Sequence, residues 1–225
     1  MDWTEETAVT TFSPRWGHQV VRFDNGDGEK FWLIGGYDKT DHKNDVWSSA
    51  DGLSWTEETS AAAFRGREGH QVVQFDDGRG NRLWLIGGYT GGLYKNDVWS
   101  SADGINWTEE NTTAAFSPRQ NHQVVIFDDG RGERFWLVGG YAPDDGVYKN
   151  DVWSSANGVI WVEETAAAAF NTSFNSQYQV VVFNDGSGER LWLISSSVWS
   201  SADGVTWIEE TASPSFPPRY DYQVV

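Results

Sequence analysis

The chain has 225 residues, of which 15% are aromatic and 14 are tryptophan, and it has no cysteine and a formal net charge of −17. The absence of cysteine excludes disulfides and thiolate chemistry. The surplus of acid argues against nucleic acid or an anionic membrane as partner, because both are bound through basic side chains. No apolar run approaches the roughly 18 residues of a membrane-spanning helix, so we expect no membrane insertion.

From its first residues onward the chain repeats itself roughly every 50 residues. The first repeat contains four short runs, His18–Phe23, Phe31–Ile34, Val46–Ser48 and Trp55–Glu58, which we call runs a, b, c and d. They are rich in Val, Ile, Trp and Phe and are bounded by Gly, Asp and Asn, which is typical of β-strands, and no stretch has a helical period. The tryptophan of run b returns at Trp32, Trp84, Trp136 and Trp192, and that of run c at Trp47, Trp99, Trp153 and Trp199.

Short turns of constant length join run a to run b and run c to run d. In the first repeat these turns are residues 24–28 and residues 50–52, and both consist mainly of Gly, Asn and Asp. These residues tolerate the backbone of tight hairpins, so the runs should pair as antiparallel strands. Four antiparallel strands in about 50 residues predict one blade of a β-propeller. We therefore predict an all-β chain with one propeller domain over 1–225, in which the repeats cover 8–59, 60–111, 112–165 and 166–211 and partial units cover 1–7 and 212–225.

Three motifs together resemble the kelch repeat: a glycine pair after run b, an Asn-Asp-Val-Trp segment at run c and an Arg-x-x-His segment before run a. The glycine pairs are Gly35-Gly36, Gly87-Gly88 and Gly139-Gly140. The Asn-Asp-Val-Trp segments are residues 44–47, 96–99 and 150–153. The Arg-x-x-His segments are residues 15–18, 67–70 and 119–122. The repeats resemble those of bacterial kelch-like propellers and of the central domain of galactose oxidase, which implies four-stranded blades around an axis. In the fourth repeat Ser195-Ser196 replace the glycines and the b–c loop shrinks to Ser197, so we expect imperfect pairing of its outer strands.

The two ends of the chain predict a larger assembly of blades. The sequence begins at a d-type run and stops within an a-type run, and these two pieces would form a split blade without runs b and c. Because an open propeller exposes sheet edges, we expect the four repeats and two half-blades to belong to a larger ring. A small closed ring of four or five blades is the alternative.

The loops that differ between repeats predict the functional face. Because strand direction alternates, the d–a and b–c connections share one face, and the b–c loops span 37–45, 89–97 and 141–151 but are essentially absent in the fourth repeat. Repeat proteins keep the turns that stacking needs and vary the loops that contact a ligand, and the family resemblance implies the same face. The candidate binding residues are Trp16, Tyr37, Asp38, His42, Glu68, Tyr94, Gln120, Asp144, Asp145, Tyr148 and Tyr220.

Other recurring polar residues are interpreted as structural. The histidines before run a (His18, His70, His122) are expected to be hydrogen-bonded rather than metal ligands, and the arginines before them (Arg15, Arg67, Arg119, Arg219) are expected to tether neighbouring blades. The Asp/Gly turns lack the spacing of a calcium loop. The glutamate pairs on run d, such as Glu57-Glu58, should lie exposed on the outermost strand, where charge discourages aggregation. We expect no metal and no cofactor.

The sequence favours a binding module over an enzyme. The segment with Ser49, Asp51, Gly52 and Trp55 resembles the Asp box of sialidase-like propellers, where that box is structural, and the other sialidase residues cannot be assembled here. The Tyr–Cys cofactor of galactose oxidase cannot form without cysteine. We predict a non-catalytic scaffold for a protein or glycan partner. The alternatives are a sialidase-like glycoside hydrolase or lyase and a purely structural module of a larger protein, and the resemblance favours an extracellular location.

Overall fold

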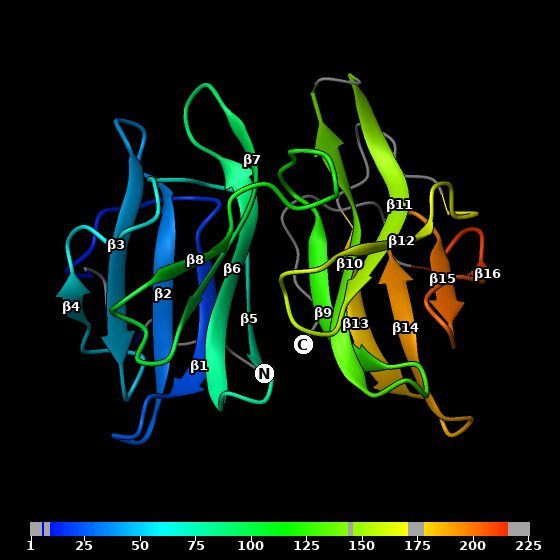
Figure 1. The fold of residues 1–225 in the computed structure, drawn as a ribbon, viewed down its shortest axis with the longest axis horizontal. Coiled ribbons are helices and arrows are strands. Elements are labelled where there is room, and N and C mark those ends of the chain that lie inside the picture. Colours follow the sequence, from blue (N-terminus) through cyan, green and yellow to red (C-terminus); the bar gives the residue numbers. More distant parts are fainter. Residues whose placement is uncertain (1–5, 7–9, 144–145, 171–177, 216–225) are drawn as a thin grey trace. The chain divides into compact units, whose positions relative to one another are not determined.

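The computed structural model describes residues 6, 10–143, 146–170 and 178–215, and within them every regular element is a β-strand. No helix long and apolar enough to cross a membrane is found among these residues. The chain divides into two compact units, Met1–Thr112 and Thr113–Val225. Each unit contains two of the predicted repeats, and each repeat forms one four-stranded sheet (Figure 1).

The first unit contains two antiparallel sheets in which sequence order equals spatial order. The first sheet comprises β1 (Gln19–Asp24), β2 (Glu29–Tyr37), β3 (His42–Ser49) and β4 (Thr56–Thr59). The second comprises β5 (Gln71–Asp76), β6 (Asn81–Tyr89), β7 (Tyr94–Ser101) and β8 (Thr108–Asn111). The four runs predicted for each of these repeats are therefore confirmed as four strands.

The second unit has the same two-sheet plan. Its first sheet comprises β9 (Gln123–Asp128), β10 (Glu133–Ala142), β11 (Val147–Ser155) and β12 (Val162–Thr165). Its second comprises β13 (Gln179–Asn184), β14 (Glu189–Ile194), β15 (Val198–Ser201) and β16 (Ile208–Thr211). The expectation of imperfect pairing here is wrong, because Val198, Trp199 and Ser200 pair with β16 in the register found in the other sheets.

The second and third strands run further than the sequence indicated. The glycine pair does not close β2 but lies inside it, where the register shifts between Ile34 and Gly36. Gly35 and Gly36 have φ of 62° and 101°, which a side chain would oppose, and this bulge lets pairing resume as far as Tyr37 and His42. The predicted nine-residue loop 37–45 is therefore wrong, and only residues 38–41 leave the sheet.

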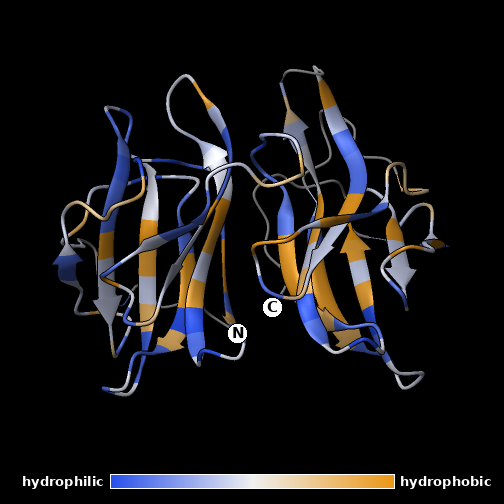
Figure 2. Cartoon of the chain, in the orientation of Figure 1, coloured by the Kyte–Doolittle hydropathy of each residue, from blue (hydrophilic) through white to orange (hydrophobic). Residues whose placement is uncertain are grey.

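Within each unit, a tryptophan of the first sheet's second strand, Trp32 of β2 or Trp136 of β10, forms the centre of the packing between the two sheets. Trp32, Trp84 and Trp136 are fully buried, and the indole of Trp32 donates to the Phe23 carbonyl at 3.1 Å. A Cβ placed on Gly104 would overlap the six-membered ring of Trp32, and one on Gly204 would overlap that of Trp136. The rings of Trp32 and Trp136 therefore pack directly under the glycine of the next sheet's c–d turn. Figure 2 shows the hydrophobic residues along the strands and hydrophilic ones in the turns.

A second aromatic contact fixes the connection that enters each sheet. Phe64, on the connection before β5, meets Trp107, just before β8, edge to face at 5.3 Å, and both are buried. Phe170 and Trp207 repeat the contact at 4.9 Å in the second unit. The side-chain amide of Asn44 also donates to the Ala62 carbonyl at 2.8 Å, which binds this connection to the preceding sheet.

Replacing Gly204 by alanine should destabilise the second unit far more than replacing Gly186. Both glycines have positive φ, 72° and 99°, so both substitutions strain the backbone, but a Cβ at Gly186 meets nothing within 4 Å. We expect Gly204→Ala to lower the free energy of unfolding by about 3 kcal/mol or more and Gly186→Ala by about 1–2 kcal/mol, since only the former also overpacks against Trp136. Urea denaturation measures both. Equal losses would contradict the packing of the indole under this turn.

Candidate functional site

The candidate site lies along the edge of the sheets where the second strand ends and the third begins. We call this the loop edge. In the first unit it comprises Trp16, Tyr37, His42, Glu68, Tyr89 and Tyr94 with loops 38–41 and 90–93. The connection that enters each sheet pairs with the end of the second strand through an isolated antiparallel β-bridge. These bridges join Trp16 to Tyr37 and Glu68 to Tyr89. The corresponding bridge in the second unit joins Gln120 to Tyr141.

Five aromatic side chains of the first unit form a continuous row along the loop edge. Trp16 meets Tyr37 edge to face at 5.0 Å between ring centroids, and Tyr37 meets His42 at 4.6 Å. His42 then meets Tyr89 of the neighbouring sheet at 5.4 Å, and Tyr89 meets Tyr94 at 4.8 Å. Trp16 is 48% exposed and the other four are half-buried. The row, which we call the aromatic row, therefore crosses both sheets of the unit.

His42 joins the two sheets at the middle of the aromatic row. Its Nε2 lies 3.3 Å from Oε1 of Glu68, on the connection that enters the second sheet. A Cβ on Gly91 would lie 3.0 Å from His42 Nδ1, so the loop of the second sheet closes directly on the imidazole. Because packing holds the ring on both sides, the row is a preformed surface.

Asp38 supports its own loop rather than presenting a free carboxylate. One carboxylate oxygen accepts from the Thr40 hydroxyl at 2.6 Å and from the Asp41 amide at 2.9 Å, and the other lies 2.8 Å from Lys43 Nζ. The hydrogen bond from Lys43, together with those of Thr40 and Asp41, holds the pKa of Asp38 well below its usual value. By contrast, the side chain of Asp41 is 77% exposed.

In the second unit the structure brings together only part of the predicted site. Tyr141 and Tyr148 are in ring contact at 4.9 Å, beside Gln120. Burial, and then the neighbouring Tyr141, raise the pKa of Tyr148. The remaining predicted residues Asp144, Asp145 and Tyr220 lie outside the described residues. Sequence reasoning missed Tyr89 and Tyr141 as site residues, although each directly follows a glycine pair, as Tyr37 does.

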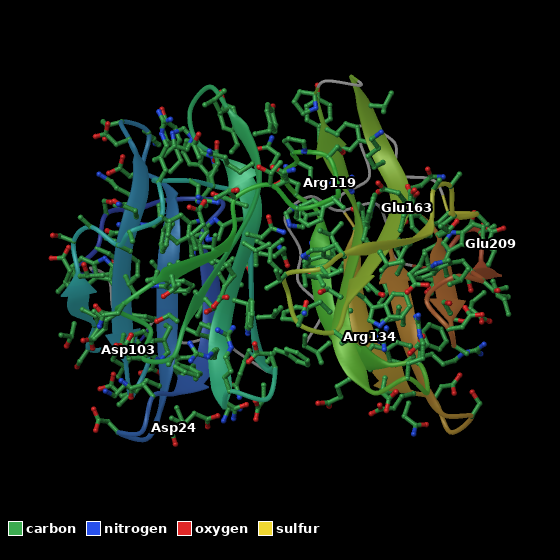
Figure 3. All side chains as sticks on the ribbon, in the orientation of Figure 1. Asp24, Asp103, Arg119, Arg134, Glu163 and Glu209 are labelled. Atoms are coloured by element: carbon green, nitrogen blue, oxygen red, sulfur yellow. The ribbon has the colours of Figure 1, made fainter. Side chains whose placement is uncertain are left out.

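A buried ion pair holds the connection at the loop edge. Both terminal nitrogens of Arg67 bind the carboxylate of Asp97 at 2.6 and 2.9 Å, and one also donates to the Gly87 carbonyl at 2.8 Å. Arg67 is fully buried and Asp97 nearly so. The corresponding pairs are Arg15–Asp45 and Arg119–Asp151, and Figure 3 labels Arg119. The expected tether between blades is therefore wrong for the side chains of Arg15, Arg67 and Arg119, because each of these ion pairs lies within one repeat. The backbone of Arg67 does bond the preceding sheet, at Gly36 and Lys43. Arg219 lies outside the described residues.

Within each unit, the residue just before the first strand of the second sheet, His70 or Tyr178, fills the space over the first sheet's glycine pair. A Cβ on Gly35 would lie 3.0 Å from Cε1 of His70, which is fully buried. At the equivalent position of the fourth repeat Tyr178 donates its hydroxyl to the Val138 carbonyl at 3.0 Å. Among the described residues no three or more His, Cys, Asp or Glu side chains are grouped to hold a metal ion.

The edge opposite the loop edge, which we call the turn edge, contains self-contained turns. Asp24 Oδ1 accepts the amides of Gly26 and Gly28 at 2.8 and 3.0 Å, and Asp51 Oδ1 accepts those of Leu53 and Ser54 at 2.8 and 2.7 Å. These last bonds, with the Ser49 hydroxyl, lower the pKa of Asp51 to about 2. The carboxylates therefore serve the turns, as expected of a structural Asp box.

The glutamate pairs of the outer strands divide into two roles. The first of each pair on these strands is exposed, and Figure 3 labels two of them, Glu163 and Glu209. The second accepts a hydrogen bond from a serine of the third strand, with Ser48 2.5 Å from Glu58 and Ser100 2.6 Å from Glu110. The expectation that both members lie exposed is therefore wrong for Glu58, Glu110 and Glu164, which are half-buried because alternation along a strand turns them inward, whereas Glu210 is exposed.

Comparison with known proteins identifies the fold. The model of a family described as the DUF6242 beta propeller domain matches residues 2–102. The solved structure described as "Structure of YjhT" matches with a TM-score of 0.64, covering 95% of this chain and 69% of that chain. The chain is a β-propeller. The likeness to YjhT, at 15% sequence identity, concerns the fold alone, and no curated protein matches the sequence. The four sheets are accordingly the blades of the propeller.

Removing the carboxylate of Asp97 should destabilise the first unit strongly at neutral pH. Burial raises the pKa of Asp97, but the hydrogen bonds and charge of Arg67, with the Trp99 indole, outweigh it and leave the pKa below its usual value. Asp97→Asn leaves the buried charge of Arg67 uncompensated, so it should lower the free energy of unfolding by about 3–5 kcal/mol. Because the folded pKa is lowered, the stabilisation is complete above about pH 4 and is lost as the pH falls further.

Urea denaturation at pH 7 and at pH 3 would measure this difference. The difference in the free energy of unfolding between Asp97→Asn and the unchanged chain should be smaller at pH 3 than at pH 7. The matched control is Asp38→Asn, because the Asp38 carboxylate also forms an ion pair, with Lys43, but on a surface loop. It should lower the free energy of unfolding at pH 7 much less than Asp97→Asn does. A gap that stays constant with pH would show that Asp97 does not stabilise through its charge.

Proposed function

We propose that the chain is a non-catalytic, kelch-type propeller module that binds a protein or glycan partner through its loop edge. Propeller domains in general serve as scaffolds and binding modules, which agrees with the fold. The observation that carries the proposal is the aromatic row, with the exposed Trp16 at its end. Tyrosine and tryptophan provide large contact area with little loss of side-chain entropy, and they are enriched where partners bind.

The contrast between the two edges of the blades supports this assignment. At the turn edge an Asp or Asn recurs at the same positions of each blade and bonds its own turn, as Asp24 and Asp51 do. At the loop edge the backbone is fixed by the recurring arginine, while the residue directly after it changes from Trp16 to Glu68 to Gln120. A constant backbone with variable side chains is the arrangement expected of a binding surface on a repeat protein.

Kelch character is proposed from the motifs and from their roles. The glycine pair forms the bulge of the second strand, and the Asp of the Asn-Asp-Val-Trp segment pairs with the arginine before the first strand. The motif residues thus act together at one edge. A sialidase-like hydrolase or lyase is the alternative. The Asp boxes do not favour it, since Ser49 and Asp51 are engaged in their own turn.

Changes in the aromatic row should abolish partner binding. The partner can be sought with a displayed peptide library and a glycan array, and its affinity measured by titration calorimetry. We expect Trp16→Ala and Tyr94→Ala each to weaken binding by about tenfold or more, as truncation of an interface anchor does. Leu53→Ser, at an exposed residue of the turn edge, is the control and should leave the affinity unchanged.

Two results would contradict the proposal. One is a partner whose affinity is unaffected by both changes in the aromatic row while Leu53→Ser weakens it, which would place binding on the turn edge. The other is turnover of a fluorogenic glycoside by the purified chain, which would favour the sialidase-like alternative. Circular dichroism of each variant establishes that it is folded.

A further inference from the structure

The two blades of each unit are held together by the same kind of contact. In the first unit, the first blade contributes Phe23 and Trp32 to a buried core, and the second blade contributes Val72 and Leu83. The equivalent core residues of the second unit are Phe127, Trp136, Val180 and Leu191. We call the face of a blade that carries the phenylalanine and the tryptophan its forward face, and the opposite face, with the valine and the leucine, its reverse face. The forward face of one blade is therefore complementary to the reverse face of another.

The forward face of the fourth blade has the same residue types as the others but lies at the surface. Phe183 is 59% exposed, whereas Phe127 at the equivalent position is 2% exposed. The indole of Trp192 donates to the Phe183 carbonyl at 3.2 Å, as in the other blades, yet this ring is half-buried where Trp136 is fully buried. Ile194, on the same strand, is also half-buried. Side chains that form a core elsewhere in the chain are therefore accessible on the fourth blade.

The reverse face of the first blade is accessible in the same way. Val20 is 48% exposed and Phe31 is 38% exposed. At the equivalent positions of the second blade, Val72 and Leu83 are buried against the first blade. The chain therefore carries both halves of a blade-to-blade contact, a forward face on the fourth blade and a reverse face on the first, and both lie at the surface.

The c–d turn of the first blade leaves room for a tryptophan of another blade. In the second blade, a Cβ on Gly104 would lie 2.4 Å from the ring of Trp32, so the ring fits there only because the turn has glycine. Gly52 of the first blade has nearly the same φ as Gly104, 76° against 78°. A Cβ on Gly52, however, would meet only Phe31 of its own blade, at 3.8 Å. Gly52 therefore offers the space that the half-buried ring of Trp192 would fill.

We propose that two copies of this chain associate head to tail, with the forward face of the fourth blade of each copy packed against the reverse face of the first blade of the other. Trp192 then lies under Gly52 of the second copy, and Phe183 packs beside Val20 of that copy, as Phe23 does beside Val72 within one chain.

A second copy is the occupant that the chain itself supports, because its first blade presents the valine, the large apolar side chain and the turn glycine that a forward face meets elsewhere. The contact joins two different surfaces, so two copies satisfy both pairs of faces by closing into a ring. Two copies supply eight blades of this kind, which is within the usual range for propellers. The inference concerns assembly and does not depend on binding at the loop edge.

Sedimentation equilibrium of the whole chain tests the association. Salt at about 0.3 M screens the repulsion between two copies that each have a formal charge of −17. We expect a mass twice the 25.2 kDa of one chain, with dissociation on dilution. The control is Leu93→Ser, at an exposed apolar residue of the loop edge, and it should leave the dissociation constant unchanged.

Opposite charges placed on the two faces test which surfaces meet. Phe183→Glu and Val20→Lys each introduce a charge into the apolar contact, so each variant alone should associate about thirtyfold more weakly or worse. Mixing the two variants should restore a dimer. In the mixed dimer one contact is unchanged, and the other brings the two opposite charges together. Circular dichroism shows whether each variant is folded, and recovery in the mixture shows it independently.

The inference is overturned if the chain stays monomeric at millimolar concentration, if both charge variants associate as strongly as the unchanged chain, or if folded variants fail to associate when mixed. These outcomes are distinct from failure of the proposed function. A monomer that binds a partner through Trp16 and Tyr94 would remove only the assembly. A dimer that the charge variants disrupt, but that binds no partner through the loop edge, would remove only the proposed function.

Discussion

The bidentate pair between a buried arginine and a buried aspartate determines the geometry of the loop edge. Arg67 joins the connection entering the second blade to β7 of that blade and, through the Gly87 carbonyl, to β6. The next residue along the chain, Glu68, is thereby held in its bridge with Tyr89. Arg15 and Arg119 place Trp16 and Gln120 in the same way. Two parallel hydrogen bonds to one carboxylate fix orientation as well as distance, which a single bond would not.

The fourth blade shows how the parts of this arrangement depend on one another. Its sequence lacks the arginine before the first strand, the glycine pair and the aspartate before the tryptophan of the third strand. Ser197 stands in place of that aspartate and accepts the Trp199 indole at 2.8 Å, as Asp45 accepts that of Trp47 at 3.0 Å. A buried aspartate without its arginine would be strongly destabilising, so the loss of one charge accompanies the loss of the other. Without the bulge, β14 ends at Ile194 and no tyrosine follows.

Much of the blade plan could be predicted from the sequence because it depends on local chemistry. The Asp/Gly turns and the alternating strands carry their own signals, and Trp32 with its equivalents marks each second strand. The extent of the strands could not be predicted in this way. Paired glycines usually end a strand, and only the register across Gly36 and Lys43 reveals a bulge after which pairing resumes. The nine-residue loop was an error of this kind.

The site was predicted less completely, because contacts between blades have no signature in one repeat. Trp16, Tyr37, His42 and Tyr94 were predicted from their places in the loops, but Tyr89 was not, although it follows a glycine pair as Tyr37 does. Its role comes from the neighbouring blade, whose His42 meets it at 5.4 Å. Asp38 was predicted to contact a partner, yet its carboxylate is bound within its loop. Composition of a loop does not show which of its charges are already neutralised.

The loop edge separates the residues that maintain the backbone from those that differ between blades. The arginine, the aspartate and the glycine pair bind one another below the surface, so the residue after the arginine and those of loops 38–41 and 90–93 can change without disturbing the strands. Thr90 of the second blade stands at the position of Asp38 in the first, and each side chain is bound within its own loop, so this change leaves the strands unaltered. Specificity can thus differ from blade to blade on one constant framework, because each blade contributes its own few side chains to a common surface.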